Sequence, residues 1–457
     1  MKRFNLLVAV ALSMLMSFAF TGCKDDDDDP TIPAEGVSNL AFTDTDLTEG
    51  TIGGTLSWNA PSSVDNITKY VIYLSSSQTE ETTKLGEAAV GTNTFAVPAG
   101  TAYNSYILVV ACNPTGESTI KAALQITDAV KPFAGFYILS AGKYGSNNGL
   151  LTFYDPETKT TTADIFNETN GRGLGDSPND IIAYGTKMYI AVYNSGVIEV
   201  TDMKAKSIKQ IKNSSEQLYP RALVADGGYV YASLYDGYVA KIDTTTLEIK
   251  AKIAVGRNPE QMAISKGKLY VANSGGMGYS SELGYDKTVS VIDLNSFTES
   301  KKITVVMNPV NMLTATNGEV YLISMGNYST VPNTLQVIDP TTDTVSTVTT
   351  TNGTEFGNLG NLIYMMYSQY DANWKQTISY ITYDAATKAV KNTNFITDGT
   401  TLAHPYKVGT EPTNGYIFVT ESDYKTNGTV HVFNAAGQQQ FSVAAGINPL
   451  KVIYVKK

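Results

Sequence analysis

The chain has 457 residues, of which 42% are hydrophobic and 17% charged, and its formal net charge is −10 at pH 7. An acidic chain of this kind is poorly suited to binding nucleic acid or to adhering to anionic lipid by charge alone. Its two cysteines provide no disulfide framework, so stability must come from buried apolar surface, which a chain of this length can supply.

Residues 1–22 are predicted to form a lipoprotein signal peptide. Lys2 and Arg3 form a basic start, residues 6–20 form an apolar core, and Gly22-Cys23 follows. This core is shorter than the roughly 20 residues that a membrane span needs. The arrangement resembles the lipobox of bacterial lipoproteins, with Phe20 in the place of the usual Leu, and it predicts lipidation at Cys23.

Residues 23–33 are predicted to form an acidic tether. A run of like charges repels itself and stays extended, so a solvated spacer is one interpretation. Lys24, Asp25 and Asp26 also resemble the surface-export signal of Bacteroidetes lipoproteins, which implies display on the cell surface. Loss of the signal peptide, with its two basic residues, changes the net charge from −10 to −12. Membrane attachment is therefore expected through acyl chains only.

Residues 34–130 are predicted to form a separate β-sandwich. Runs with alternating apolar residues, such as residues 70–74 and 106–110, are typical of half-buried strands. The segment around Trp58 and residues 111–118 resemble the Trp strand and the Ala-x-Asn-x-x-Gly-x-Ser turn of fibronectin type III domains. The resemblance implies a fibronectin type III-like domain, which we expect to act as a spacer. A ligand-binding role for this domain is the alternative.

Residues 131–457 contain a unit that is repeated seven times. Each copy has an apolar strand that ends in an acidic or amide residue and then a Thr- or Lys-rich turn. The copies end 41 to 50 residues apart, at Asp155, Asp202, Asp243, Asp293, Asp339, Asp384 and Asn434. This period is typical of four-stranded blades, which bury their faces only against neighbouring blades. The predicted fold class is all-β: a fibronectin type III-like β-sandwich followed by a seven-bladed β-propeller.

A proline marks the entrance of most units. Proline suits the first position of a strand, where no ladder N–H is needed. In the fourth unit the predicted strands are residues 261–264, 268–272, 288–293 and 300–305. The entry pairs are Ser177-Pro178, Tyr219-Pro220, Asn258-Pro259, Asn308-Pro309, His404-Pro405 and Asn448-Pro449. The last pair opens an inner strand with no unit after it, and the first unit lacks that strand. We therefore predict that the C-terminal strand completes the first blade and closes the ring.

The sequence gives little support for a catalytic function. The two histidines, His404 and His431, lie in different parts of the last unit. The sequence contains no nucleophile elbow, phosphate loop or paired-histidine metal motif. His404 sits at a blade entrance, where it can face a ligand, and His431 sits in mid-strand. We expect no cofactor and no metal site.

Every unit carries a tyrosine in the loop between its second and third strands. In a propeller these loops share one face with the connections that open the inner strands, so the rings are predicted to form an aromatic crown. Tyrosine offers a rigid apolar face and a hydroxyl group, as recognition surfaces require. The alternative is that some rings only pack between blades. Glu260, Gln261 and Asn311 also lie at the blade entrances on this face. The predicted ligand-binding residues are Tyr144, Tyr193, Tyr235, Tyr279, Tyr285, Tyr328, Tyr370, Trp374 and Tyr424 in the loops, and Arg172, Arg221, Arg257 and His404 at the entrances.

The repeats resemble YVTN-type β-propellers, as in residues 268–273 followed by 289–293. From residue 136 onward the propeller is similar to surface lipoproteins of Bacteroidetes, a group that includes proteins capturing cobalamin over an outer-membrane transporter. The resemblance implies a non-enzymatic protein, lipid-anchored at the outer membrane and exposed on the cell surface. It would capture a bulky ligand on one propeller face and hand it to a transporter, with no nucleic-acid partner. The first expectation for the ligand is cobalamin or another corrinoid.

Three alternatives stay open. The ligand can be a siderophore or a glycan. A propeller lactonase or lyase would work through His404 and nearby carboxylates, which would then cluster in a deep central pocket. An adhesin would use the aromatic face to bind matrix.

Overall fold

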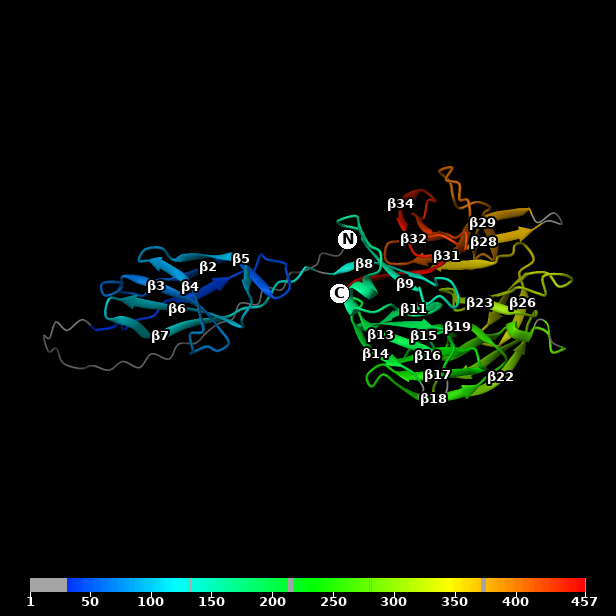
Figure 1. Cartoon of the computed structure of the whole chain (residues 1–457), viewed down its shortest axis with the longest axis horizontal. Helices are drawn as coiled ribbons and strands as arrows, with labels where there is room; N and C mark the ends of the chain where they lie inside the picture. Colours follow the sequence, from blue (N-terminus) through cyan, green and yellow to red (C-terminus); the bar gives the residue numbers. More distant parts are fainter. Residues whose placement is uncertain are drawn as a thin grey trace. The chain divides into compact units, whose positions relative to one another are not determined.

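The computed structural model describes residues 31–131, 133–212, 217–278, 280, 282–370 and 375–456, with only the backbone of Tyr370. The predicted lipidation and export residues Cys23, Lys24, Asp25 and Asp26 lie outside the described residues. The chain divides after Lys131 into two compact units, which are drawn in Figure 1.

The first unit is built from two antiparallel sheets that share one core. The three-stranded sheet has the order β1-β2-β5, and the four-stranded sheet has the order β4-β3-β6-β7. Its strands are β1 (Ser38–Phe42), β2 (Thr51–Asn59), β3 (Lys69–Ser75), β4 (Thr83–Ala89), β5 (Thr94–Ala102), β6 (Tyr106–Asn113) and β7 (Gly116–Gln125). Trp58 of β2 meets Tyr70 of β3 edge-on, with ring centroids 5.5 Å apart, inside this core. Cys112 is buried at the end of β6.

Within its described residues, the second unit contains seven four-stranded antiparallel sheets, which we number in chain order. Sheet 1 has the order β35-β8-β9-β10, and the other six are each formed by four consecutive strands. Sheets 1 to 3 consist of β35 (Pro449–Lys456), β8 (Ala134–Ser140), β9 (Leu150–Asp155) and β10 (Thr160–Thr162); β11 (Pro178–Tyr184), β12 (Lys187–Val192), β13 (Val197–Asp202) and β14 (Ser207–Ile211); and β15 (Pro220–Asp226), β16 (Tyr229–Leu234), β17 (Tyr238–Asp243) and β18 (Glu248–Ala254).

Sheets 4 to 7 repeat this arrangement. They consist of β19 (Pro259–Ser265), β20 (Lys268–Asn273), β21 (Thr288–Asp293) and β22 (Thr298–Thr304); β23 (Pro309–Thr314), β24 (Val320–Ser324), β25 (Thr334–Asp339) and β26 (Thr344–Thr347); β27 (Glu355–Leu359), β28 (Leu362–Tyr370), β29 (Gln376–Asp384) and β30 (Ala389–Asn392); and β31 (Pro405–Glu411), β32 (Tyr416–Glu421), β33 (Thr429–Phe433) and β34 (Gln439–Ala444). The short helices α1 (Ile165–Asn170) and η1 (Gly276–Gly278) lie in connections.

The first strand of each sheet, which we call its inner strand, contacts the inner strands of both neighbouring sheets. The contacts run from β11 through β15, β19, β23, β27 and β31 to β35, and β35 in turn contacts β11. The inner strand of sheet 1 is the last strand of the chain, and it pairs antiparallel with β8. This arrangement, visible as the ring of strands in Figure 1, fits a β-propeller.

The cores of the second unit lie between adjacent sheets. For example, Tyr189 of sheet 2 packs with Leu223 of sheet 3, and Phe136 of sheet 1 packs with Phe418 of sheet 7. An aromatic residue in the first half or the middle of each second strand is buried in these layers: Tyr137, Tyr189, Tyr231, Tyr270, Tyr321, Tyr364 and Phe418. Each sheet therefore depends on its neighbours for the burial of its apolar faces.

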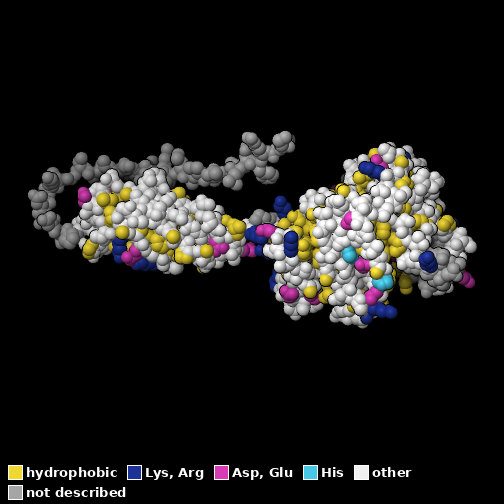
Figure 2. Space-filling model, turned by 90° about the horizontal axis from the view of Figure 1, so that it is seen from above, with side chains coloured by type: hydrophobic (Ala, Val, Ile, Leu, Met, Phe, Trp, Pro, Cys, Tyr) yellow, Lys and Arg dark blue, Asp and Glu magenta, His cyan; other side chains and the backbone are white. Residues whose placement is uncertain are grey.

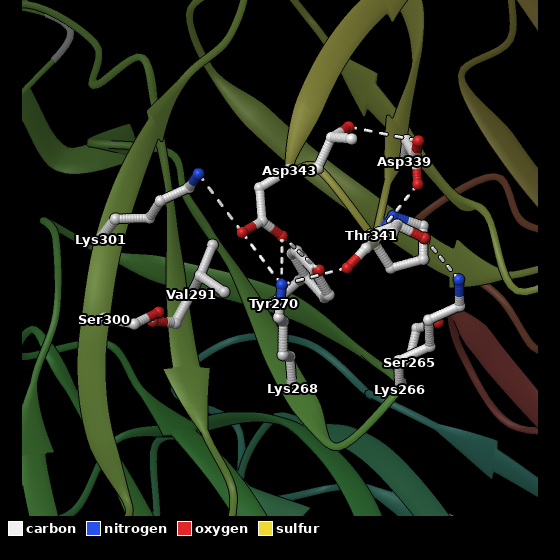
Figure 3. Close-up of polar contacts among 12 residues, drawn as sticks. Ser265, Lys266, Lys268, Tyr270, Val291, Ser300, Lys301, Asp339, Thr341 and Asp343 are labelled. Carbon is white, nitrogen blue, oxygen red and sulfur yellow. Dashed lines mark hydrogen bonds and ion pairs between the residues drawn. The ribbon is translucent and has the colours of Figure 1, made fainter.

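Polar contacts also join neighbouring sheets at the turns opposite the inner-strand starts. Asp343, between β25 and β26, accepts a hydrogen bond from the Tyr270 hydroxyl at 2.7 Å and pairs with Lys268 at 2.9 Å (Figure 3). Lys301 lies 3.3 Å from the same carboxylate. Burial alone would raise the pKa of Asp343, but the Tyr270 hydroxyl and the two lysines outweigh it and lower the pKa. This carboxylate thus ties sheet 4 to sheet 5.

Candidate ligand-binding site

The entrances of the inner strands share one local geometry. In five of them the residue before the proline has a positive φ of 47° to 60°: Ser177, Tyr219, Asn258, Asn308 and Asn448. The carbonyl of this residue accepts the N–H of the residue that follows the second strand, as in Tyr235 N–H to Tyr219 O at 2.9 Å. The loops after the second strands and the inner-strand starts therefore lie on the same face, which we call the entrance face.

A cavity of about 660 Å³ opens among the inner strands. All seven inner strands contribute to its wall, and six of them do so with residues that follow an entry proline. In six of the strands the ladder register shifts at this point, as between Pro178 and Asp180 or between Pro449 and Lys451. Such bulges re-aim side chains, and here they lie at the cavity wall. Tyr144 and Tyr193 complete the wall from the loops.

Six charged residues line this cavity, and all six are paired across neighbouring inner strands. Asp180 of β11 pairs with Lys451 of β35 at 2.5 Å. Arg221 of β15 pairs with Glu260 of β19 at 2.7 Å. The third pair is Glu355 of β27 with Lys407 of β31, at 2.5 Å. We call these six residues the charge ring; its formal charges cancel.

Arg221 is held by aromatic rings as well as by its partner. Its guanidinium carbon lies 5.4 Å from the centroid of the Tyr193 ring and 4.8 Å from that of Tyr235. Its Nε and Nη2 both donate to the same oxygen of Glu260, at 3.0 and 2.7 Å. Burial, with a smaller contribution from the Glu260 carboxylate, raises the pKa of Tyr235 to about 12. Tyr235 is therefore neutral, and Arg221 has a fixed position in the wall.

Lys407 is fixed in a similar way. Burial lowers its pKa, but the Glu355 carboxylate more than offsets this, so the net shift is upward and the ammonium group stays charged. Its Nζ also lies 5.5 Å from the centroid of the Tyr406 ring. The Asn311 side chain donates to the Thr354 carbonyl at 2.8 Å and to Glu355 at 3.3 Å, which holds the carboxylate from the other side.

Large hydrophobic side chains are exposed on the entrance face. In the described part of the second unit, all such side chains except Ile208 in β14 lie in its loops or at the strand ends beside them: Tyr144 (74% exposed), Tyr219, Tyr238, Met277, Leu283, Tyr328 (69%) and Tyr424 (61%). Tyr285 packs edge-on against Tyr328, and Tyr424 against Tyr406. An exposed apolar rim around a cavity is typical of a binding surface. Figure 2, which is turned by 90° from Figure 1, shows another side of the molecule, where charged side chains of both signs are scattered among uncharged ones.

Of the predicted site residues, Tyr144, Tyr193 and Arg221 line the cavity. Tyr235 lies behind Arg221, and Tyr285, Tyr328 and Tyr424 lie on the entrance face. Tyr279, Trp374 and the side chain of Tyr370 lie outside what the structure describes.

The three residues that were predicted at the entrances besides Arg221 do not line the cavity. Arg172 pairs with Glu199 of β13 at 2.8 Å, and its guanidinium lies over the ring of Phe166. Arg257 donates to the Gly284 carbonyl at 3.1 Å. The exposed His404 is held by its backbone N–H, which donates to Glu421 at 2.9 Å. His431 meets the other oxygen of Glu421 at 2.8 Å. His404 is therefore not clustered with acids in the central cavity.

Sequence reasoning missed most of the charge ring. It placed Arg221 and Glu260 at the entrances, but not Asp180, Glu355, Lys407 or Lys451. The signal was present, because three of these four lie two residues after an entry proline. Glu355 begins β27, an inner strand that has no entry proline.

The opposite end of the inner strands forms a second, apolar cavity of about 430 Å³. Ile182, Val224 and Ile264 contribute to its wall, and Leu313 and Lys451 line both cavities. Among the residues that the structure describes, no group of three or more His, Cys, Asp or Glu side chains is placed to hold a metal ion. No helix within the described residues is long and apolar enough to cross a bilayer.

These features define an all-β protein with a propeller-like unit that carries a cavity at the entrance face. The chain belongs to the family described as Domain of unknown function (DUF5074), whose model matches residues 134–445. No curated protein matches the chain.

Among solved structures, the chain is similar to hydrazine synthase of Kuenenia stuttgartiensis, with 14% identity over 72% of this chain and 92% of that one and a TM-score of 0.45. It is also similar to a chain of the mitotic checkpoint complex (14% identity, 60% and 81% covered, TM-score 0.46) and to the Neurospora crassa Pan2 WD40 domain (12%, 60% and 80%, 0.42). With TM-scores below 0.5, these likenesses add nothing to the argument from topology.

Proposed function

We propose that this protein is a non-enzymatic capture protein that binds a bulky ligand at the entrance face of a seven-bladed β-propeller. The observation that carries the proposal is the cavity of about 660 Å³, which all seven inner strands line and which exposed rings such as Tyr144 surround. Ligand sites are concave, largely preformed and rich in aromatic side chains. Each of the six charged side chains of the charge ring is already held in an ion pair, which suits a rigid binding wall better than a set of catalytic groups.

The closed seven-bladed ring is part of this proposal. Two observations support it. Contacts between inner strands run from β11 round to β35 and back to β11, and sheets 7 and 1 share an apolar core like the cores between the other pairs of adjacent sheets. The first unit is proposed to be a fibronectin type III-like spacer, which its strand orders β1-β2-β5 and β4-β3-β6-β7 support. The buried Trp58 in β2 agrees with this proposal.

The proposed location is the cell surface, with a lipid anchor at Cys23 and export directed by Lys24, Asp25 and Asp26. The sequence order of basic start, apolar core, Gly22-Cys23 and acidic run supports it. From there the captured ligand would pass to an outer-membrane transporter. Cobalamin or another corrinoid is the first candidate ligand, followed by a glycan or a siderophore.

A thermal-shift screen of the mature chain tests the proposal. The probes are cyanocobalamin, neutral oligosaccharides and ferric siderophores. A ligand that binds only the folded state stabilises it by about 2.7 kcal/mol at 100 times its Kd, so a true ligand should raise Tm clearly. Tyr144→Ala should reduce this shift. The proposal fails if no probe raises Tm. It also fails if the rise in Tm is the same in Tyr144→Ala as in the wild type but is lost when residues on the opposite face are replaced.

A further inference from the structure

The cavity wall contains two amide side chains that the protein itself does not use. Five Asn or Gln residues line the cavity, and three of them are engaged: Asn311 by the Thr354 carbonyl, Asn358 by the Thr314 carbonyl and Asn448 by the Gly142 carbonyl. Within the described part of the chain, no hydrogen bond is formed by the side chains of the other two, Asn179 and Gln261. Both are half-buried.

These two amides lie close to the aromatic part of the wall. Asn179 is in β11 and Gln261 is in β19, the inner strands on either side of β15, which carries Arg221. Tyr193 lies over Arg221, and Tyr144 lines the same cavity. Each amide offers donors and an acceptor, so each can bind a donor and an acceptor group of a ligand.

The charge ring, by contrast, has no free charge to offer. An anionic ligand that bound Arg221, Lys407 or Lys451 would have to share the cation with a carboxylate that lies 2.5 to 2.7 Å away and repels the ligand. Complete displacement would leave that carboxylate without its partner in a partly buried site, which is strongly unfavourable. A cationic ligand is disfavoured in the same way, because Asp180, Glu260 and Glu355 are already paired with cations that would repel it.

We infer that the cavity selects a ligand without net charge, rich in amide or hydroxyl groups, and that Asn179 and Gln261 are its specificity-determining residues. This inference rests on the proposed capture function. The ligand's apolar surface stacks on the exposed rings, its polar groups bond to the two free amides, and the charge ring stays intact as the floor. Anionic siderophores are therefore disfavoured as ligands of this cavity.

The test is isothermal titration calorimetry of the mature chain at 50 and 500 mM NaCl. The probes are cyanocobalamin as the amide-bearing molecule, a neutral oligosaccharide as the polyhydroxy molecule, and ferric enterobactin as the anion. The inference predicts binding of one of the two neutral probes with a Kd that changes by less than about twofold between the two salt concentrations, since no ion pair forms. Which neutral probe binds identifies the source of the hydrogen-bonding groups.

Variants locate the contacts. Asn179→Ala and Gln261→Ala are expected to weaken binding by about fivefold or more each, because a ligand group loses its hydrogen bond. Gln261→Glu keeps the shape, removes the donors and adds a carboxylate, so it should also weaken binding. Gln440→Ala, an exposed residue of β34, is the matched control and should leave the Kd unchanged.

The outcomes separate this inference from the proposed function. Binding of ferric enterobactin alone, or a Kd that rises tenfold or more with salt, overturns the uncharged-ligand inference but leaves a capture protein. Binding of a neutral probe that Asn179→Ala and Gln261→Ala leave unchanged overturns the role of the two amides. Failure of every probe to bind contradicts both proposals.

Discussion

Lys451 and Asp180 lie 271 residues apart in the chain, yet the Lys451 Nζ and the Asp180 Oδ1 are separated by only 2.5 Å. Asp180 is 1% exposed, and its other carboxylate oxygen accepts the backbone N–H of Leu223 at 2.8 Å. One buried carboxylate therefore connects the C-terminal strand β35 to β11 and β15. The last strand thus meets β11 in the wall of the cavity, so the integrity of the site and the proposed closure of the ring depend on the same contact.

Removal of the cation from this pair should destabilise the fold. Lys451→Met is expected to cost about 3 kcal/mol, because it leaves the Asp180 carboxylate buried without a counter-charge. The double variant Lys451→Met/Asp180→Asn should recover much of that loss. Urea unfolding of the three proteins measures the difference. A single variant as stable as the wild type would show that the pair contributes nothing to closure.

Deletion of residues 448–457 should disrupt cooperative unfolding of the second unit. Val452 of β35 packs in the core between sheets 7 and 1, and Val455 packs in the core between sheets 1 and 2. The deletion thus exposes two cores at once and leaves β8 without its partner strand. Circular dichroism during heating should show a broad, early transition. Lys456→Ala, exposed at the end of the same strand, is the control and should melt like the full chain.

The contribution of Asp343 to stability should depend on pH. Its pKa is lowered in the folded state from an ordinary value of 3.8. The stabilisation is therefore complete above about pH 4 and is lost as the pH falls through the lower folded pKa. Asp343→Asn should be less stable than the wild type at pH 6, and the gap in free energy of unfolding should narrow below about pH 4. Asp226→Asn, at an exposed position at the end of β15, should show a much smaller gap at pH 6. If the difference in free energy of unfolding between the wild type and Asp343→Asn grew as the pH fell, the stabilising role of the Asp343 carboxylate would be contradicted.

The strands could be predicted from the sequence where the same residue type recurs at the same place in each unit. Six inner strands begin at the predicted entry prolines, and the predicted strand at residues 288–293 agrees with β21 to the residue. The predicted outer strand 300–305 is shifted from β22, which spans Thr298–Thr304, because a Thr- and Ser-rich turn gives no sharp boundary. The inner strand β27 was not anticipated, since it lacks the proline.

The site was harder to predict because its chemistry comes from residues that do not share a motif. Asp180 and Lys451 become partners only when the C-terminal strand β35 of sheet 1 packs beside β11 of sheet 2. Arg172 looks like an entrance residue in the sequence, but Glu199, which is fully buried in the neighbouring β13, holds it. Tyrosines fall into two sets that the sequence alone did not separate. Those near the starts of the second strands, such as Tyr270, are buried between sheets, while loop tyrosines such as Tyr144 are exposed.

The loop tyrosines should contribute to affinity and little to stability. Tyr144→Ala and Tyr193→Ala are expected to weaken ligand binding by roughly tenfold or more, about 1.4 kcal/mol, since aromatic anchors carry much of the energy of a binding surface. The controls are Asp243→Ala and Asp339→Ala in turns away from the entrance face. Asp243 accepts the N–H groups of Thr245 and Thr246, each at 2.8 Å, so its loss should lower Tm and leave the Kd unchanged. The opposite pattern would put the site on the other face.

Lipidation at Cys23 can be tested in cells. Cys23→Ala should release the protein from the membrane fraction, because no other anchor is proposed. Replacement of Asp25–Asp29 by Ala should retain membrane attachment but protect the protein from protease added to intact cells. Digestion of that variant at the wild-type rate would exclude a role of the acidic run in export.

The central claim is that the ligand binds at the entrance face, and hydrogen–deuterium exchange with and without the tightest-binding probe of the screen tests it most directly. We predict that the probe slows exchange in the loops around Tyr144, Tyr193 and Tyr219 and at the inner-strand starts near Asn179 and Gln261, with no change in the turns at residues 243–247 and 339–343. Protection confined to those turns, or to the first unit, would contradict the account.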